Sequence, residues 1–373
     1  MKVWNETGAR EEHEKSGMAP PTVSRARRPL GAAAQWVAAL ALAFTCLQAA
    51  AEESAFSDIN YRLGEGLQVA DTGFSLGGYA TASYEHLRHA PARTALDNLS
   101  LFVWWQGEGR WKFFSELDYE NVLASPSSDQ PGENRYLALE RLYVDYALNN
   151  TTTLRAGKFL TPIGRWNLIH ATPLVWTTSR PLVTTQIFPT NATGLMLNGT
   201  LPTVAHGTDY SLYASKGSEP RSNPALDPFR EAIGAHVAFP LLEDGQIGFS
   251  YASFEQDKTP DEKKRLTGID FVWSRNRYEV SGEGVYRSSD NGSEWDEKGA
   301  FGQLVVPLSA KLYAVGRYEI FRKARETLTT RLWVAGLNYR ITPAIVLKAE
   351  WNGATHNTID APEGFMSSLS LLF

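Results

Sequence analysis

A long acid-free part of the chain stands out as a candidate site for charge-based chemistry. It runs from Tyr146 to Thr208, although the whole sequence carries 41 Asp and Glu residues. Its core, Leu154 to Gly194, combines basic side chains with aromatic residues and prolines. Because no carboxylate of this segment balances its cations, we predict local positive potential, which attracts anions. The candidate residues are Arg155, Lys158, Arg165 and Arg180, with His170 as a fifth.

Motifs for catalysis and metal binding are weaker. The segment Gly73 to Gly77 matches the GxSxG nucleophile pattern, which has meaning only between a strand and a helix. Phe74 and Leu76 instead alternate as in a strand, so we predict no catalytic residue there. His170 has no carboxylate partner in its own segment, and the histidines are scattered along the chain. We therefore expect no metal site, no cofactor and no enzymatic activity.

Residues 1–51 have the layout of a secretory signal peptide. A basic patch precedes an apolar run, Leu30 to Leu47, and a small-residue sequence that ends at Ala51. The residues before Met18 are polar and charged, which favours Met18 as the true translation start. The one cysteine, Cys46, lies inside this segment. The exported chain is thus expected to use neither disulfides nor thiol chemistry.

The composition narrows the class of protein. The formal net charge of −5 argues against a nucleic-acid partner. Aromatic residues make up 12% of the chain, yet no apolar segment after residue 51 approaches the roughly 20 residues of a membrane helix. An exported, aromatic-rich chain with alternating polarity is typical of an outer-membrane β-barrel.

Period-2 alternation predicts an all-β transmembrane antiparallel barrel of about 16 strands over residues 73–373, after a short periplasmic segment at 52–72. Short turns alternate with longer polar connections, as expected for periplasmic and extracellular ends. The predicted strands cover 74–85, 96–106, 111–120, 136–148, 151–159, 193–201, 209–215, 231–239, 246–254, 266–274, 278–287 and 365–373, with four more joined at 307–309 and 341–343. The longer connections are 86–94, 125–134, 154–194, 216–228, 256–264, 288–297, 322–326 and 356–364.

Each predicted strand has one apolar and one ionised track. Trp333, Tyr339 and Trp351 lie on the track expected to face lipid. A barrel of this width leaves an aqueous channel, so the opposite track is expected to line a wet lumen. A mixed set of lumen charges favours cross-strand ion pairs over a ladder of substrate sites. The candidate lumen residues are Arg141, Arg317, Lys348, Glu116 and Asp118.

Two segments resemble known outer-membrane proteins. The chain looks like a trimeric-type bacterial porin, and the run from Leu154 to Gly164 resembles the strand-to-loop segment of the phosphate-selective porin O and P family. The terminal Phe373 resembles the carboxy-terminal aromatic signal that the barrel-assembly machinery recognises. The resemblance implies a third loop folded into the pore, anion uptake through basic residues on that loop, and a homotrimer in contact with outer-membrane lipid and lipopolysaccharide.

The acid-free segment falls at this third loop, between the fifth and sixth predicted strands. Its cations either make the constriction selective for anions or pair with wall acids such as Glu116, Asp118 and Asp145 and pin the loop. We therefore predict an outer-membrane channel for passive diffusion of small hydrophilic solutes, with a preference for anions such as phosphate. A channel specific for sugars or aromatic compounds is the main alternative, and an outer-membrane enzyme is a weaker one.

Overall fold

The computed structural model describes residues 59–62, 66–69, 72–125, 135–217, 219–220 and 226–373. The predicted signal peptide and translation start lie outside these residues. Within the described residues, one antiparallel sheet contains eighteen strands. Two are short, β1 (Ile59–Arg62) and β2 (Gly66–Val69), and they form a hairpin whose second strand pairs with the start of β3.

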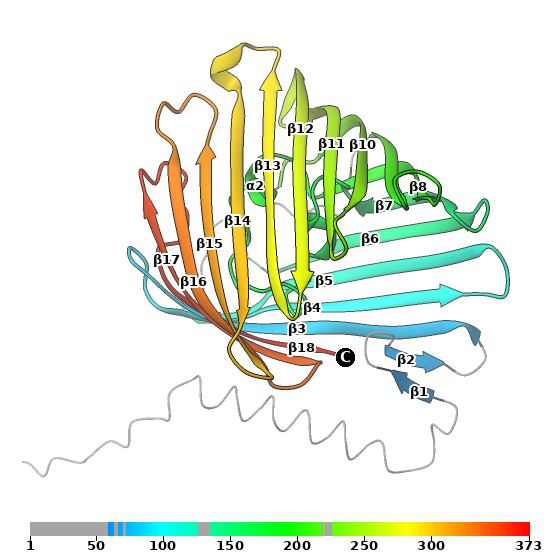
Figure 1. Ribbon diagram of the computed structural model, residues 1–373, viewed down its shortest axis with the longest axis horizontal. Coiled ribbons are helices and arrows are strands. Elements are labelled where there is room, and N and C mark those ends of the chain that lie inside the picture. Colours follow the sequence, from blue (N-terminus) through cyan, green and yellow to red (C-terminus); the bar gives the residue numbers. More distant parts are fainter. Residues whose placement is uncertain (1–58, 63–65, 70–71, 126–134, 218, 221–225) are drawn as a thin grey trace, which may run out of the picture. The chain divides into compact units, whose positions relative to one another are not determined.

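The other sixteen strands form a closed barrel. Each pairs with its neighbours in sequence, and β18 returns to pair with β3 from Gly364↔Leu87 to Leu372↔Tyr79 (Figure 1). Closure leaves the barrel without an unpaired sheet edge. Such an edge would expose backbone N–H and C=O groups to the hydrocarbon of a membrane without hydrogen-bond partners. The strands are β3 (Phe74–Leu87), β4 (Arg93–Gln106), β5 (Trp111–Ser125), β6 (Tyr136–Ala147), β7 (Thr152–Leu160), β8 (Asn191–Leu201), β9 (Thr208–Lys216), β10 (Phe229–Leu241), β11 (Gly245–Gln256), β12 (Thr259–Arg275), β13 (Tyr278–Ser289), β14 (Glu297–Pro307), β15 (Leu312–Arg322), β16 (Thr330–Arg340), β17 (Ile345–Thr355) and β18 (Gly364–Leu372).

The predicted strand positions are confirmed, with one connection wrong. Residues 256–264 were expected to form a long loop, but β12 already begins at Thr259. Its first part carries Glu262 and Lys264, which are only 6% and 4% exposed and form an ion pair at 3.4 Å. Polar side chains that suggested a loop therefore belong to a strand, because the interior of this barrel accommodates charge.

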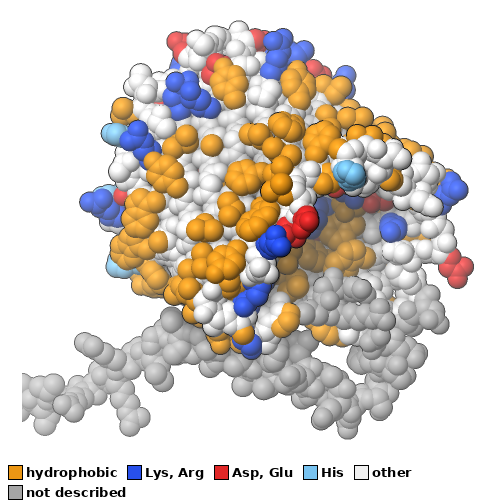
Figure 2. All heavy atoms as spheres, in the orientation of Figure 1, with side chains coloured by type: hydrophobic (Ala, Val, Ile, Leu, Met, Phe, Trp, Pro, Cys, Tyr) orange, Lys and Arg blue, Asp and Glu red, His pale blue; other side chains and the backbone are white. Residues whose placement is uncertain are grey.

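The two predicted tracks are also confirmed. Trp333 and Trp351 are 44% and 55% exposed on the outer face, whereas Arg317 and Lys348 are 3% and 1% exposed on the inner face. Figure 2 shows hydrophobic side chains across the middle of the outer face formed by β12 to β15. An outward Lys or Arg at the bilayer midplane would cost about 2 to 4 kcal/mol, which explains the separation.

The remaining elements are short. The GxSxG segment continues into β3, as the alternation predicted. Two short helices, η2 (Trp166–Ile169) and α2 (Leu182–Gln186), lie between β7 and β8, and η3 (Ser293–Trp295) lies between β13 and β14. No helix in the described part of the chain is long and apolar enough to cross a membrane.

Candidate pore constriction

The connection between β7 and β8, residues 161–190, folds into the barrel, as predicted. Its helix α2 lies against β13, β14 and β15, and Figure 1 shows it behind these strands. Ile163 and Ile187 are fully buried in a cluster that also contains wall residues such as Phe301 and Leu332. Burying these side chains favours an inward position, because they would expose apolar surface in an outward loop. We call residues 161–190 the inner loop.

Wall carboxylates hold the backbone of the inner loop at its first turn. Glu283 of β13 accepts hydrogen bonds from the backbone N–H groups of Arg165 at 2.8 Å and Trp166 at 2.5 Å. Gly164 has φ +65°, and a Cβ at this position would lie 2.3 Å from Glu283 Oε2. Glycine is therefore required both for the backbone conformation and for the close approach of the carboxylate.

The same type of contact recurs farther along the inner loop. Glu350 of β17 accepts from the backbone N–H groups of Thr178 at 2.8 Å and Ser179 at 2.9 Å. Glu319 of β15 accepts from the N–H of Leu182 at 2.7 Å. Hydrogen bonds to an ionised acceptor are stronger than neutral ones. One carboxylate from each of three strands thus holds the inner loop through its backbone N–H groups.

Two predicted lumen cations complete this anchorage from the donor side. Arg317 donates to Ser179 Oγ at 2.8 Å, to the Ser179 carbonyl at 3.1 Å and to Thr177 Oγ1 at 2.5 Å. Lys348 donates to the carbonyls of Thr172 and Thr177. Both side chains do face the lumen, but they are used to hold the inner loop.

Two of the predicted selectivity cations have carboxylate partners at the root of the inner loop. Arg155 makes two hydrogen bonds with Asp145, at 2.7 and 2.9 Å, and its guanidinium lies 3.6 Å from the centre of the Tyr143 ring. Lys158 forms an ion pair with Glu219. The expected pairing of Arg155 with Asp145 is present, but it joins the adjacent strands β6 and β7 and does not pin the loop.

The predicted wall acids behave differently from one another. Glu116 pairs with Arg141 across β5 and β6. Asp118 has no ion-pair partner among the described residues, and its Oδ1 is buried without a hydrogen bond there. Neither acid contacts a cation of the inner loop in the described part of the structure. Of the three acids proposed to pin the loop, none does so through Arg165 or Arg180.

Arg165 and Arg180 therefore carry the positive charge of the inner loop. Arg165 is exposed and lines a cavity of about 250 Å³ that also contains Glu279. The Arg180 guanidinium lies 5.0 Å from the centre of the Trp166 ring. Within the described residues, its Nε and Nη2 atoms have no hydrogen-bond partner.

His170 is placed so that it does not add to this charge. Its Nε2 lies 3.9 Å from Glu140 Oε1. Burial lowers the pKa of His170 well below its ordinary value, and the charges of Arg180 and Arg141 lower it further. The imidazole is therefore neutral at neutral pH.

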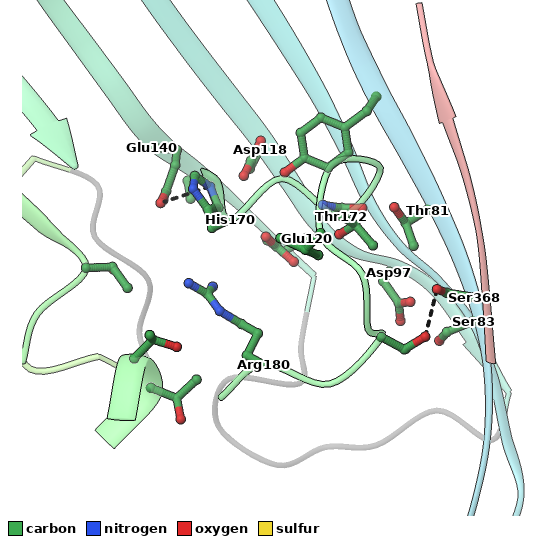
Figure 3. Close-up of a pocket in the computed structure, with 18 of the residues that line it drawn as sticks. Thr81, Ser83, Asp97, Asp118, Glu120, Glu140, His170, Thr172, Arg180 and Ser368 are labelled. Atoms are coloured by element: carbon green, nitrogen blue, oxygen red, sulfur yellow. Dashed lines mark hydrogen bonds and ion pairs between the residues drawn. The ribbon is translucent and has the colours of Figure 1, made fainter. Parts of the chain in front are cut away.

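The inner loop leaves a cavity of about 290 Å³ against the wall formed by β3 to β6 and β18. Arg180 and His170 face it from the loop, and Thr81, Ser83 and Ser368 line one side (Figure 3). Five carboxyl side chains also line it: Glu85, Asp97, Asp118, Glu120 and Glu140. We call this space the acidic cavity.

Two of these carboxylates could not be assigned from strand alternation. The pairing of β3 with β4 shifts between Thr81 and Ala82, so Asp97 is an extra residue at a β-bulge. The pairing of β5 with β6 shifts at Glu116/Leu117, which makes Glu140 the extra residue beside Arg141. A bulge interrupts the two-residue period and re-aims side chains. Both bulges thereby add an acid to the lumen.

Comparisons with known proteins agree with this architecture. No protein-family model matches the chain. An uncharacterized protein of Aquifex aeolicus is 27% identical over 183 residues, which is 48% of this chain and 41% of that protein. The alignment thus spans about two fifths of the length of this relative.

Solved structures show the same fold at low sequence identity. An anion-selective porin from Comamonas acidovorans is 11% identical with a TM-score of 0.52, over 80% of this chain and 98% of that one. Salmonella typhi OmpF, in a complex with daunomycin, is 9% identical with a TM-score of 0.59, over 81% and 98%. The chain therefore has the fold of bacterial outer-membrane porins.

Proposed function

We propose that the protein is an outer-membrane channel for passive diffusion of small hydrophilic solutes. The observation that carries this proposal is a closed sixteen-stranded barrel whose charged side chains face inward and whose inner loop leaves a polar cavity. A barrel of this size encloses an aqueous lumen, and charged linings at a narrow zone set selectivity. The Comamonas porin of similar fold is described as anion-selective, which is compatible with the proposal.

The preference for anions, including phosphate, is the finer part of the proposal and rests on Arg165 and Arg180. Arg155 and Lys158 contribute less to the field, because each has a carboxylate partner. A second candidate is a preference for cations, and the observation that favours it is the set of carboxylates on the wall of the acidic cavity. The sign of the selectivity separates the two.

Reversal potentials in planar lipid bilayers under a KCl gradient test both parts. The purified protein should give stepwise conductance, and the absence of any conductance would overturn the channel itself. With an anion preference, Arg165→Glu combined with Arg180→Glu should move the reversal potential toward cations. A wild-type reversal potential of cation-selective sign would replace the anion preference by the second candidate.

Arg275, at the short turn between β12 and β13, provides a matched control. Arg275 has a 57% exposed side chain and pairs with Asp244 rather than with the inner loop. Arg275→Glu makes the same charge reversal as each of the two loop substitutions, far from the acidic cavity in sequence, and should leave the reversal potential near the wild-type value. A shift in this variant equal to that of Arg165→Glu or Arg180→Glu alone would show that overall charge, not the constriction, sets selectivity.

A further inference from the structure

The acidic cavity has a guanidinium on its loop side and a group of carboxyl side chains on its strand side. On the loop side, no described carboxylate lies within ion-pair distance of the Arg180 guanidinium, and two of its nitrogens lack hydrogen-bond partners among the described residues. A guanidinium is always charged at physiological pH and presents donors in a geometry that matches a carboxylate. Arg180 is therefore placed to bind an anionic group by donating hydrogen bonds to it.

On the wall side, Asp118 of β5 supplies the opposite pole. Asp118 is only 4% exposed, lines the acidic cavity, and has one carboxylate oxygen with no hydrogen bond to any described residue. A buried polar atom without a partner carries a desolvation penalty, which a bound donor would relieve. Asp97 and Glu120 lie on the same wall and strengthen the negative pole.

The two poles come from different elements that face the same space. Figure 3 shows Arg180 reaching in from the inner loop, with Asp97, Asp118 and Glu120 on the strand side. A solute with one charge would satisfy one pole and be repelled by the other. A solute with a carboxylate and an ammonium group can satisfy both.

We propose that the acidic cavity binds small zwitterions, such as free amino acids, with the solute carboxylate on Arg180 and its ammonium group on Asp118 and its acidic neighbours. This inference rests on the proposed function and names the solute class at its constriction. A volume of about 290 Å³ accommodates such a molecule. Hydroxyl groups of Ser83 and Ser368 line the same cavity and offer further hydrogen bonds.

Four solutes of nearly equal size separate the charge classes. Alanine is a zwitterion, alaninamide a cation, lactate an anion and lactamide neutral. Each is added to planar bilayers that contain the full protein, and the reduction of the KCl current is measured against concentration. Alanine should act at a concentration about tenfold lower than lactate or alaninamide, corresponding to about 1.4 kcal/mol for the second charged contact. Lactamide, which lacks both charges, should act no better than these two.

Variants test whether the two poles are responsible. Arg180→Gln and Asp118→Asn should each remove the advantage of alanine, whereas Arg275→Gln should retain it. Because Asp118 lies in a strand, the heat-dependent electrophoretic mobility of the variant is used to confirm a folded barrel; Arg180→Gln changes only a loop residue. Equal action of alaninamide or lactate, or an unchanged advantage of alanine in Arg180→Gln, would overturn the proposal.

Calorimetric titration of alanine into the detergent-solubilised protein makes the test independent of conductance. Binding of alanine without any conductance would uphold the zwitterion site and overturn the channel. Conductance without preferential action or binding of alanine would uphold the channel and overturn the zwitterion site.

Discussion

At the scale of single residues, a charge in the lumen matters according to whether it has a partner. Arg155 and Lys158 looked equivalent to Arg180 in the sequence, yet both are paired and Arg180 is not paired with any described residue. Asp145 is close to Arg155 in sequence, so that pair could be anticipated. Glu219, by contrast, approaches Lys158 from a different connection, and alternation along one strand carries no such information.

His170 provides the residue-scale prediction. Its pKa is lowered, so the docked state binds its proton less readily than a loop that has left the wall. The contribution of His170 therefore favours docking above its ordinary pKa of about 6.5 and is lost as the pH falls below that value. At neutral pH, His170→Asn should leave the reversal potential unchanged in planar bilayers, whereas Arg180→Gln should shift it toward cations.

At acidic pH, in contrast, the wild-type protein and His170→Asn should differ. Below pH 6 the wild-type protein should show noisier single-channel currents as protonation of His170 opposes docking, and His170→Asn should show less of this change. A reversal potential that moves with His170→Asn at neutral pH would mean that the imidazole is charged there.

At the scale of elements, strands were predictable and their irregularities were not. The track with Trp333 and Trp351 outward follows from the two-residue period and the cost of charge in lipid. Asp97 and Glu140 enter the lumen through bulges, and a bulge depends on the register of two strands together. The inward position of the inner loop was predictable from its apolar content, but its acceptors on β13, β15 and β17 were not.

The anchorage of the inner loop gives the element-scale prediction. Glu283→Ala combined with Glu350→Ala removes the acceptors of four backbone N–H groups at two places along the loop. Hydrogen bonds to charged groups contribute roughly 1.5 to 3 kcal/mol each, so docking should weaken substantially. Single-channel recordings should show larger and noisier conductance, because the loop leaves the lumen for part of the time.

Glu262→Ala is the matched control for this change. Glu262 is also a buried wall carboxylate, but it bonds to Ser289 and Lys264 rather than to the inner loop. The Glu262→Ala variant should therefore have a conductance close to that of the wild-type protein. If the double variant conducts like wild type as well, the apolar contacts of Ile163 and Ile187 alone hold the loop.

At the scale of the whole molecule, closure joins the two ends of the barrel. Gly78 of β3 donates to the Phe373 carbonyl at 2.8 Å, and the Phe373 N–H donates to the Gly78 carbonyl at 2.9 Å. A Cβ on Gly78 would lie 2.0 Å from the Ser100 carbonyl oxygen and 2.9 Å from the Phe373 ring, so this seam requires glycine. The barrel as a class could be predicted, because lipid on one side and water on the other impose alternation on every strand. The seam itself depends on residues almost 300 positions apart.

Phe373 allows the seam to be separated from the predicted recognition by the barrel-assembly machinery. Phe373→Ala keeps both backbone hydrogen bonds to Gly78 and removes only the ring, so refolding of the purified chain into detergent should stay close to wild type. Assembly in cells should fall severalfold, because the terminal aromatic side chain is the proposed signal. Heat-dependent electrophoretic mobility measures the folded fraction in both settings. Deletion of Phe373 removes the backbone hydrogen bonds as well and should impair both refolding in detergent and assembly in cells. Equal losses for Phe373→Ala in the two settings would mean that the ring acts through closure of the barrel. Recognition by the assembly machinery would then need another signal.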